Sequence, residues 1–127
     1  MIVRVGKVTN VYAKKGKVKV LYEDTGNTSM QLPVLTMNNE YSMPAVGDRV
    51  LTLHMENGSS KGFVLGTYYG GGNTPKASSG YRKDLGGGAY ISCTKGGAVT
   101  IHSSGDITFS GSSGSITLSE IISHIKS

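Results

Sequence analysis

A short apolar triplet that recurs at nearly constant spacing constrains the fold of this sequence more than any other feature. Each triplet places one small polar residue between two residues of apolar character. The four triplets are Ile91-Ser92-Cys93, Val99-Thr100-Ile101, Ile107-Thr108-Phe109 and Ile116-Thr117-Leu118. Gly97, Gly105 and Gly114 each stand two residues before a triplet, as expected where a chain turns sharply between very short strands. Residues 89–118 are therefore predicted to form a β-solenoid element.

These triplets give one chain a narrow ribbon with a single apolar face, because alternate residues of a strand point the same way. Burying one such side chain yields about 1.5 to 3 kcal/mol. Ordering the backbone costs about 1 to 2 kcal/mol for every residue fixed, so a lone ribbon is not stable. Three ribbons wound about a common axis bury every apolar face and complete the backbone hydrogen bonds. The predicted trimer-axis residues of this shaft are Ile91, Cys93, Val99, Ile101, Ile107, Phe109, Ile116 and Leu118.

The last residues change from strand to helix periodicity. Leu118, Ile121, Ile122 and Ile125 have the i, i+3, i+4, i+7 spacing of an amphipathic helix. Thr117 and Glu120 have the spacing of a capping box. A helix over 119–127 is too short to be stable alone, so Ile121, Ile122 and Ile125 are also predicted to pack at the trimer axis.

The first half of the chain reads as short strands separated by turns. Apolar and polar residues alternate over residues 17–22 and 49–54, and weaker patterns cover residues 2–13, 30–35 and 63–65. Asn57-Gly58 is predicted to be a tight turn before the last of these strands. Five short strands with glycine at the corners suit a small closed barrel, for which an OB-type barrel is the natural candidate.

The predicted fold class is thus all-β, with four parts. An N-terminal OB-type five-stranded barrel covers residues 1–69 and serves as a collar. Residues 70–88, rich in glycine and serine, form a linker. An intertwined trimeric triple-stranded β-helix covers 89–118, and a short tip helix covers 119–127.

Composition argues against several classes of function. The net charge of +5 is not concentrated in either half, so no nucleic-acid footprint stands out. The lone Cys93 excludes an intrachain disulfide framework and fits synthesis in a reducing cytoplasm. The sequence contains neither the apolar run of a signal peptide nor 18 consecutive apolar residues, so we expect a soluble protein.

No catalytic, cofactor or metal site is predicted. The carboxylates fall mainly at predicted turns and edges without forming a facing pair, and the glycine clusters lack the phosphate-loop pattern. His102 is expected to face outward, and His124 lies beside the apolar stripe of the tip helix. An alternative is an OB-fold module that binds single-stranded nucleic acid through stacking tyrosines, with nearby lysines at the phosphates. The residues for that alternative are Tyr12, Tyr22, Tyr41, Tyr68, Tyr69, Lys14, Lys15, Lys17 and Lys19.

Four motifs of the first half carry a family resemblance. They are Gly6-Lys7-Val8, Leu32-Pro33-Val34-Leu35, residues 44–51 with the sequence PAVGDRVL, and residues 62–68 with the sequence GFVLGTY. In their order and spacing they resemble the baseplate assembly protein V family of contractile-tailed phages. The same OB module is found in the spike proteins of type VI secretion systems. In that family a triple-stranded β-helix follows the barrel directly, so the resemblance covers nearly the whole chain.

The resemblance implies a structural role in a phage or tailocin baseplate and no enzymatic activity. It implies a homotrimer, assembled in the bacterial cytoplasm, that contacts hub proteins above the collar and transiently contacts the target cell envelope. A separate tip protein is a further partner that the resemblance allows. Larger relatives insert a lysozyme or effector domain, and some end in a His-x-His apex that binds iron. Neither feature is found in this sequence.

Overall fold

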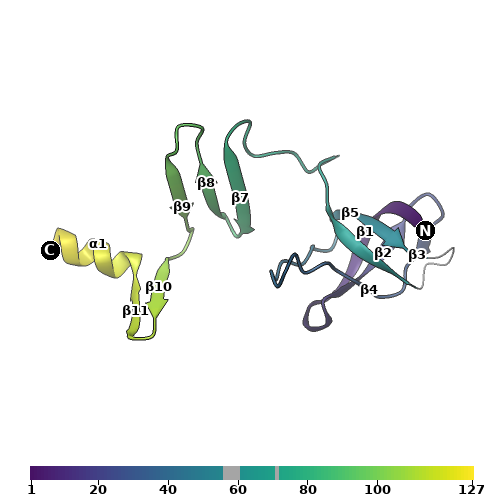
Figure 1. The fold of residues 1–127 in the computed structure, drawn as a ribbon, viewed down its shortest axis with the longest axis horizontal. Helices are drawn as coiled ribbons and strands as arrows, with labels where there is room; N and C mark the ends of the chain where they lie inside the picture. The colour runs from purple at the N-terminus through teal and green to yellow at the C-terminus, as the bar shows by residue number, and fades with distance from the viewer. Residues whose placement is uncertain (56–60, 71) are drawn as a thin grey trace. The chain divides into compact units, whose positions relative to one another are not determined.

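The computed structural model describes residues 1–55, 61–70 and 72–127. The chain divides into two compact units, Met1–Thr74 and Pro75–Ser127, close to the predicted end of the barrel at Tyr69 (Figure 1). The turn predicted at Asn57-Gly58 lies outside the described residues. The protein is all-β with one short C-terminal helix, as predicted.

The N-terminal unit is built around one antiparallel sheet. Its elements are β1 (Ile2–Tyr12), a 3₁₀ turn (Ala13–Lys15), β2 (Lys17–Tyr22), β3 (Asn27–Thr28), β4 (Leu32–Pro33), β5 (Arg49–His54) and β6 (Gly62–Thr67). The strands follow the order β3-β2-β1-β5-β6, and β4 pairs with β2. A register shift between Val8 and Asn10 bends the long strand β1, which pairs with β5 through its first half and with β2 through its second.

Alternation in these strands decides which side chains form the core. In β2 and β5 every second residue is fully buried, which is the pattern the sequence predicts. The buried apolar core consists of Val8, Val18, Val20, Tyr22, Leu32, Val50 and Val64.

The segment that follows β4 approaches the far edge of the sheet. Val34 forms an isolated parallel bridge with Val64 of β6. The backbone N–H of Leu35 donates to the carbonyl of Val64 at 3.1 Å. Residues 32–35 therefore contact both β2 and β6.

The C-terminal unit contains two small antiparallel sheets and a helix. Strands β7 (Tyr81–Gly86), β8 (Ala89–Cys93) and β9 (Val99–His102) form a three-stranded meander. Strands β10 (Thr108–Gly111) and β11 (Gly114–Thr117) form a hairpin, and α1 (Leu118–Lys126) follows directly. The predicted helix is confirmed to within one residue at each end.

Two expectations for this unit need correction. The interval 70–88, predicted to be a linker, contains β7, which pairs with β8 along its length. The triplet strands, predicted to pair between three chains, pair antiparallel within one chain. Ile107 precedes β10 and Leu118 begins α1, so the last two triplets lie only partly in strands.

Candidate interaction surface

The predicted trimer-axis residues of the meander lie on one face of its sheet. Ile91 pairs with Ile101 across β8 and β9, and Cys93 pairs with Val99 in the same register. Because residues two apart in a strand share a face, these four side chains form one apolar patch. On the third strand Tyr81 lies opposite Cys93 and Lys83 lies opposite Ile91, so β7 adds one aromatic and one charged residue to this face.

The hairpin brings its own pair of axis residues together. Phe109 lies opposite Ile116 in the β10–β11 register. One step beyond the strand ends, the N–H of Leu118 donates to the carbonyl of Ile107 at 2.8 Å. Ile107 and Leu118 therefore continue the row that Phe109 and Ile116 begin. We call the two patches, of the meander and of the hairpin, the apolar face.

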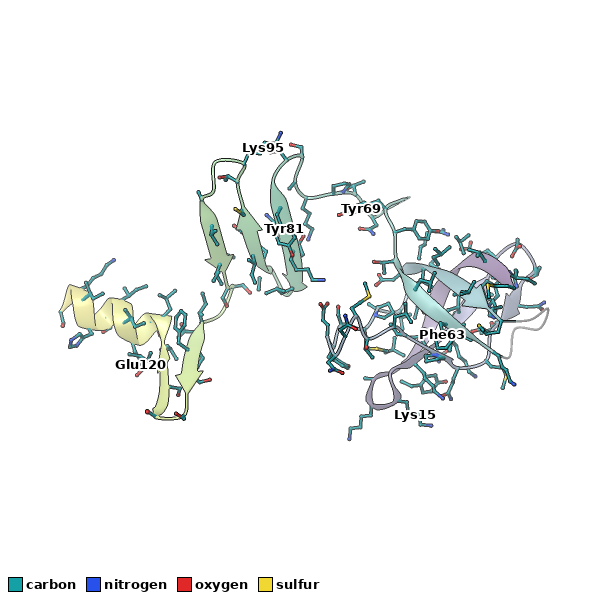
Figure 2. The ribbon with its side chains drawn as sticks, in the orientation of Figure 1. Lys15, Phe63, Tyr69, Tyr81, Lys95 and Glu120 are labelled. Atoms are coloured by element: carbon teal, nitrogen blue, oxygen red, sulfur yellow. The ribbon has the colours of Figure 1, made fainter. Side chains whose placement is uncertain are left out.

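This apolar face is uncovered in a single chain. Every residue of Pro75–Ser127 is described, and none is buried. Val99 is 65% exposed, Ile101 57% and Phe109 52%. Within this unit the strands form single layers (Figure 2). Such an amount of exposed apolar surface is typical of a protein–protein contact, since a monomer rarely leaves it in water.

The opposite face of the meander is polar and aromatic. The guanidinium of Arg82 lies 3.8 Å from the centroid of the Tyr90 ring. That ring stacks on His102, with centroids 5.1 Å apart and planes 25° from parallel. Arg82 also bridges to Asp84 at 3.0 Å. One contact row thus crosses β7, β8 and β9 on the face away from Ile91 and Ile101, so His102 lies where the sequence predicts it.

A complete capping box begins α1. The N–H of Glu120 donates to the Thr117 hydroxyl at 3.2 Å, and the N–H of Thr117 donates to the Glu120 carboxylate at 3.0 Å. Thr117 is both the last residue of β11 and the N-cap, which confirms the predicted motif. Along the helix Ile121 is half-buried, whereas Ile122 and Ile125 are exposed.

Asp106 ties the start of the hairpin to the start of the helix. Its carboxylate accepts hydrogen bonds from the hydroxyl and N–H of Ser119 and from the N–H of Ile107. The hydroxyl of Ser119, followed by these backbone donors, holds the pKa of Asp106 below its usual value. Asp106 therefore acts as a structural anchor in its ionised form.

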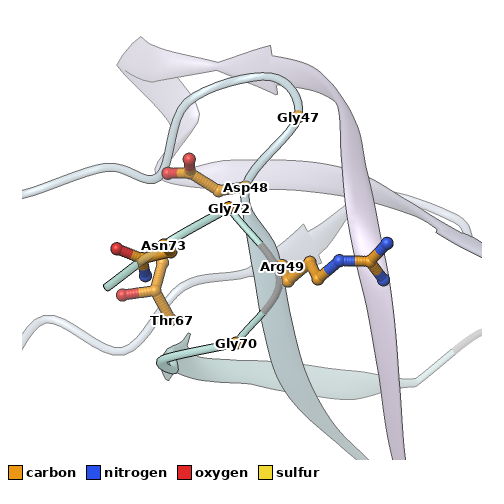
Figure 3. A pocket seen from close by; sticks show the side chains of 7 residues that line it. All are labelled: Gly47, Asp48, Arg49, Thr67, Gly70, Gly72 and Asn73. Carbon is orange, nitrogen blue, oxygen red and sulfur yellow. The ribbon is translucent and has the colours of Figure 1, made fainter. Parts of the chain in front are cut away.

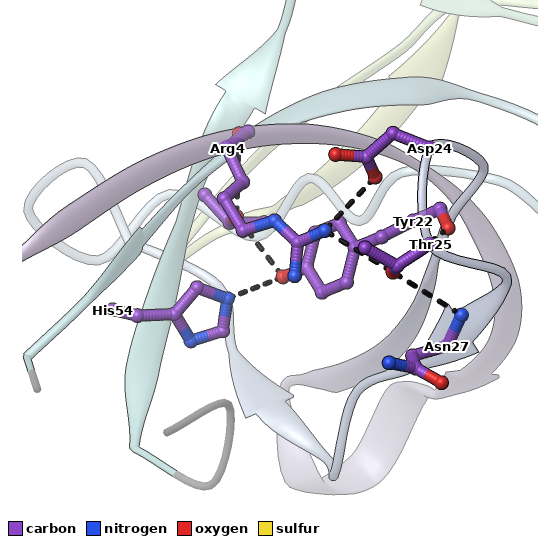
Figure 4. A network of polar contacts seen from close by, with 7 residues as sticks. Arg4, Tyr22, Asp24, Thr25, Asn27 and His54 are labelled. Carbon is purple, nitrogen blue, oxygen red and sulfur yellow. Dashed lines mark hydrogen bonds and ion pairs between the residues drawn. The ribbon is translucent and has the colours of Figure 1, made fainter. Parts of the chain in front are cut away.

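A polar network lies inside the N-terminal unit (Figure 4). The buried Tyr22 hydroxyl bonds to Thr52 at 3.0 Å and to His54 Nε2. Arg4 lies 3.8 Å over the Tyr22 ring and bridges to Asp24 at 2.9 Å. Burial raises the pKa of Tyr22 and lowers that of His54, so both groups are held neutral. The network gives partners to the Tyr22 hydroxyl, Thr52 and His54 Nε2, whereas His54 Nδ1 is buried without a hydrogen-bond partner among the described residues.

A surface pocket of the same unit is lined by Gly47, Asp48, Arg49, Thr67, Gly70, Gly72 and Asn73 (Figure 3). Three of its polar side chains, those of Asp48, Arg49 and Asn73, have partners within the chain. Asp48 accepts from the N–H of Ala45 at 2.8 Å, and Asn73 donates to the carbonyl of Tyr68 at 3.0 Å. Arg49 points away from Asp48 and bridges to Glu23 at 3.1 Å. The pocket presents no nucleophile beside a base.

Other potential sites receive no support from the geometry. Within the described ranges, no group of three or more His, Cys, Asp or Glu is placed to hold a metal ion. Tyr22 is fully buried and so is unable to stack on a nucleic-acid base, although Tyr41 and Tyr69 are exposed. Among the described residues, no helix has the length and apolar character needed to span a membrane.

The sequence analysis missed the row formed by Arg82, Tyr90 and His102. Its signal was weak because Arg82 lies in the interval 70–88, which was predicted to be a linker. Comparison with protein-family models and with curated proteins finds no match to this chain.

Proposed function

We propose that this protein is one subunit of the trimeric central spike of a contractile phage tail or tailocin baseplate. The observation that carries the proposal is the apolar face of the unit Pro75–Ser127, no residue of which is buried in one copy. Three copies packed about a common axis would bury that face and leave the row of Arg82, Tyr90 and His102 in solvent. The shaft would then be three-sided, with each copy contributing its own meander and hairpin.

We propose an OB-type barrel for the N-terminal unit, acting as the collar of the spike. Two contacts support it: the Val34–Val64 bridge and the hydrogen bond from Leu35 to Val64. They join the chain after β4 to β6, while β4 itself pairs with β2. The strand order and the motifs that resemble the baseplate assembly protein V family agree with this architecture.

The proposed mechanism is mechanical. Hub proteins of the baseplate bind above the collar, and contraction of the tail sheath drives the shaft and its tip helix through the target cell envelope. The protein contributes stiffness through closely spaced strands, tight glycine turns and a helix that follows β11 without a loop. No enzymatic step, metal ion or nucleic acid enters this mechanism.

The mass in solution tests the proposal directly. Light scattering of the full chain should give about three times its 13.3 kDa mass. A fragment ending at Thr74 keeps the buried core of the N-terminal unit but lacks the apolar face, so it should associate far more weakly. A full chain that stays monomeric at micromolar concentration would contradict the proposal. Salt-sensitive binding of single-stranded DNA by that monomer would instead favour the nucleic-acid alternative.

A further inference from the structure

The sheet of the N-terminal unit has a second apolar surface, on the side away from its core. Val3 lies opposite Leu53, which lies opposite Phe63, and Val5 lies opposite Leu51 on a neighbouring rung. Val3 is 62% exposed, Val5 54% and Phe63 39%, while the two leucines are half-buried. We call these five side chains, from three adjacent strands, the outer face (Phe63 is labelled in Figure 2).

The outer face departs from the usual pattern of a solvated sheet. An antiparallel sheet with one side in water places polar residues on that side. Strand β2 follows the rule at Lys17 and Lys19, which alternate with its buried residues, whereas the third residue of that row is Leu21. Strand β5 breaks it, because Leu51 and Leu53 alternate with the buried Val50, Thr52 and His54. The region around β1, β5 and β6 thus has the composition of a sheet covered on both sides.

Charged residues border the outer face at one end. Lys7 and Arg49 lie opposite each other on the next rungs of the β1–β5 ladder and continue the outward-facing rows. Arg49 also pairs with Glu23 at 3.1 Å. A central apolar area with a polar margin is the usual composition of a protein–protein interface.

The size of the outer face indicates what covers it. A stable complex between separate proteins takes about 20 to 30 residues from each side. Five side chains fall far short of that, so they would not by themselves hold an independent partner. Copies already joined through another part of the chain meet at an effective concentration of about millimolar, where a small contact persists. This reasoning favours a second copy of the same chain.

We propose that the outer face is the contact between neighbouring N-terminal units within the trimer. The proposal rests on the trimeric assembly proposed above and assigns its collar contact to Val3, Val5, Leu51, Leu53 and Phe63. Other proteins of the particle would then bind the collar elsewhere.

Protection of engineered cysteines tests this contact in the full chain. Val5→Cys and Phe63→Cys each place a thiol on the outer face, and Lys14→Cys places one on an exposed turn as the matched control. Each variant is first confirmed as a trimer by light scattering and then treated with a maleimide. Peptide mass spectrometry follows each site separately from Cys93. We expect the two outer-face thiols to react at least tenfold more slowly than the control, and all three at equal rates in denaturant.

The outcomes separate this proposal from the one on which it rests. If the variants are trimers and both outer-face thiols react as fast as the control, the proposed contact between N-terminal units is wrong, but the proposal of a trimeric spike is not contradicted. If the unmodified chain is a monomer, both the proposed trimeric spike and the proposed contact between N-terminal units are contradicted. A variant that fails to assemble is replaced by Val3→Cys, which lies on the same face.

Discussion

Ile91 lies directly opposite Ile101 in the β8–β9 ladder, while their neighbours Tyr90 and His102 stack on the other side of the same sheet. This alternation gives a sheet of single-layer thickness two chemically different faces. One face is apolar, and the other carries the contacts of Arg82, Tyr90 and His102 within the chain. The two faces can therefore be tested separately by substituting adjacent residues.

Ile101→Asp should abolish the trimer. Three copies of the substitution would place carboxylates together in an apolar environment without partners, which is strongly unfavourable. Thr100→Asp introduces the same charge one residue away, on the face that carries Tyr90 and His102, and should leave the trimer intact. Sedimentation velocity of both variants measures the difference. If Ile101→Asp and Thr100→Asp sediment alike, the apolar face does not lie at the axis of the trimer.

The stability of the N-terminal unit should fall as the pH drops below about 6.5. Burial lowers the pKa of His54 in the folded state from its model-peptide value of 6.5. At a pH between the lowered pKa of folded His54 and the value of 6.5 in the unfolded chain, the unfolded chain binds more protons than the folded chain, so lowering the pH favours unfolding. Above pH 6.5 His54 is neutral in both states and contributes no pH dependence. Urea denaturation of residues 1–74 between pH 5 and 8 measures it, since His54 is the histidine of that fragment. His54→Gln should flatten the profile over this range.

Gly6→Ala should destabilise the N-terminal unit by about 1 to 3 kcal/mol. A Cβ at this position would lie 2.4 Å from Cγ1 of Val20 and 2.7 Å from the carbonyl oxygen of Leu21, so the core must shift. Gly72→Ala is the control, because a Cβ there meets nothing within 4 Å. Chemical denaturation measures the free energy of unfolding of both variants. If Gly72→Ala lowers it as much as Gly6→Ala does, the proposed clash at Gly6 is contradicted.

Thr117→Ala should cost about 1 kcal/mol, the usual cost of removing a side-chain N-cap. The change removes the hydroxyl that accepts from the N–H of Glu120. Thr117→Ser keeps that hydroxyl and should retain most of the stability. Thermal unfolding followed by circular dichroism measures both, and identical melting of wild type and Thr117→Ala would contradict the role of the cap.

Local chemistry made several parts of the structure predictable. Strict alternation in β2 and β5 identified their buried residues, because burial of one face leaves a period of two in the sequence. The capping box at Thr117 was predictable because it depends on residues only three positions apart. The grouping of the triplet residues on one face also followed from this alternation.

Pairing partners were not predictable in the same way. A recurring triplet shows that a strand needs a neighbour, but not whether the neighbour belongs to the same chain. Strand β7 was missed because glycine and serine clusters flank Tyr81–Gly86, and because Lys83 interrupts its apolar row. The contacts of Arg82 with Tyr90 depend on the β7–β8 register, which no short-range signal in the sequence defines.

The pairing of β8 with β9 and of β10 with β11 within one chain has a consequence for how the chain folds. Strands that are neighbours in sequence find one another quickly, because only short loops have to close. The C-terminal unit can therefore form its strand pairs without waiting for a second copy. In the proposed trimer, three copies would meet with these strand pairs already formed, so the rate of assembly would depend on their concentration.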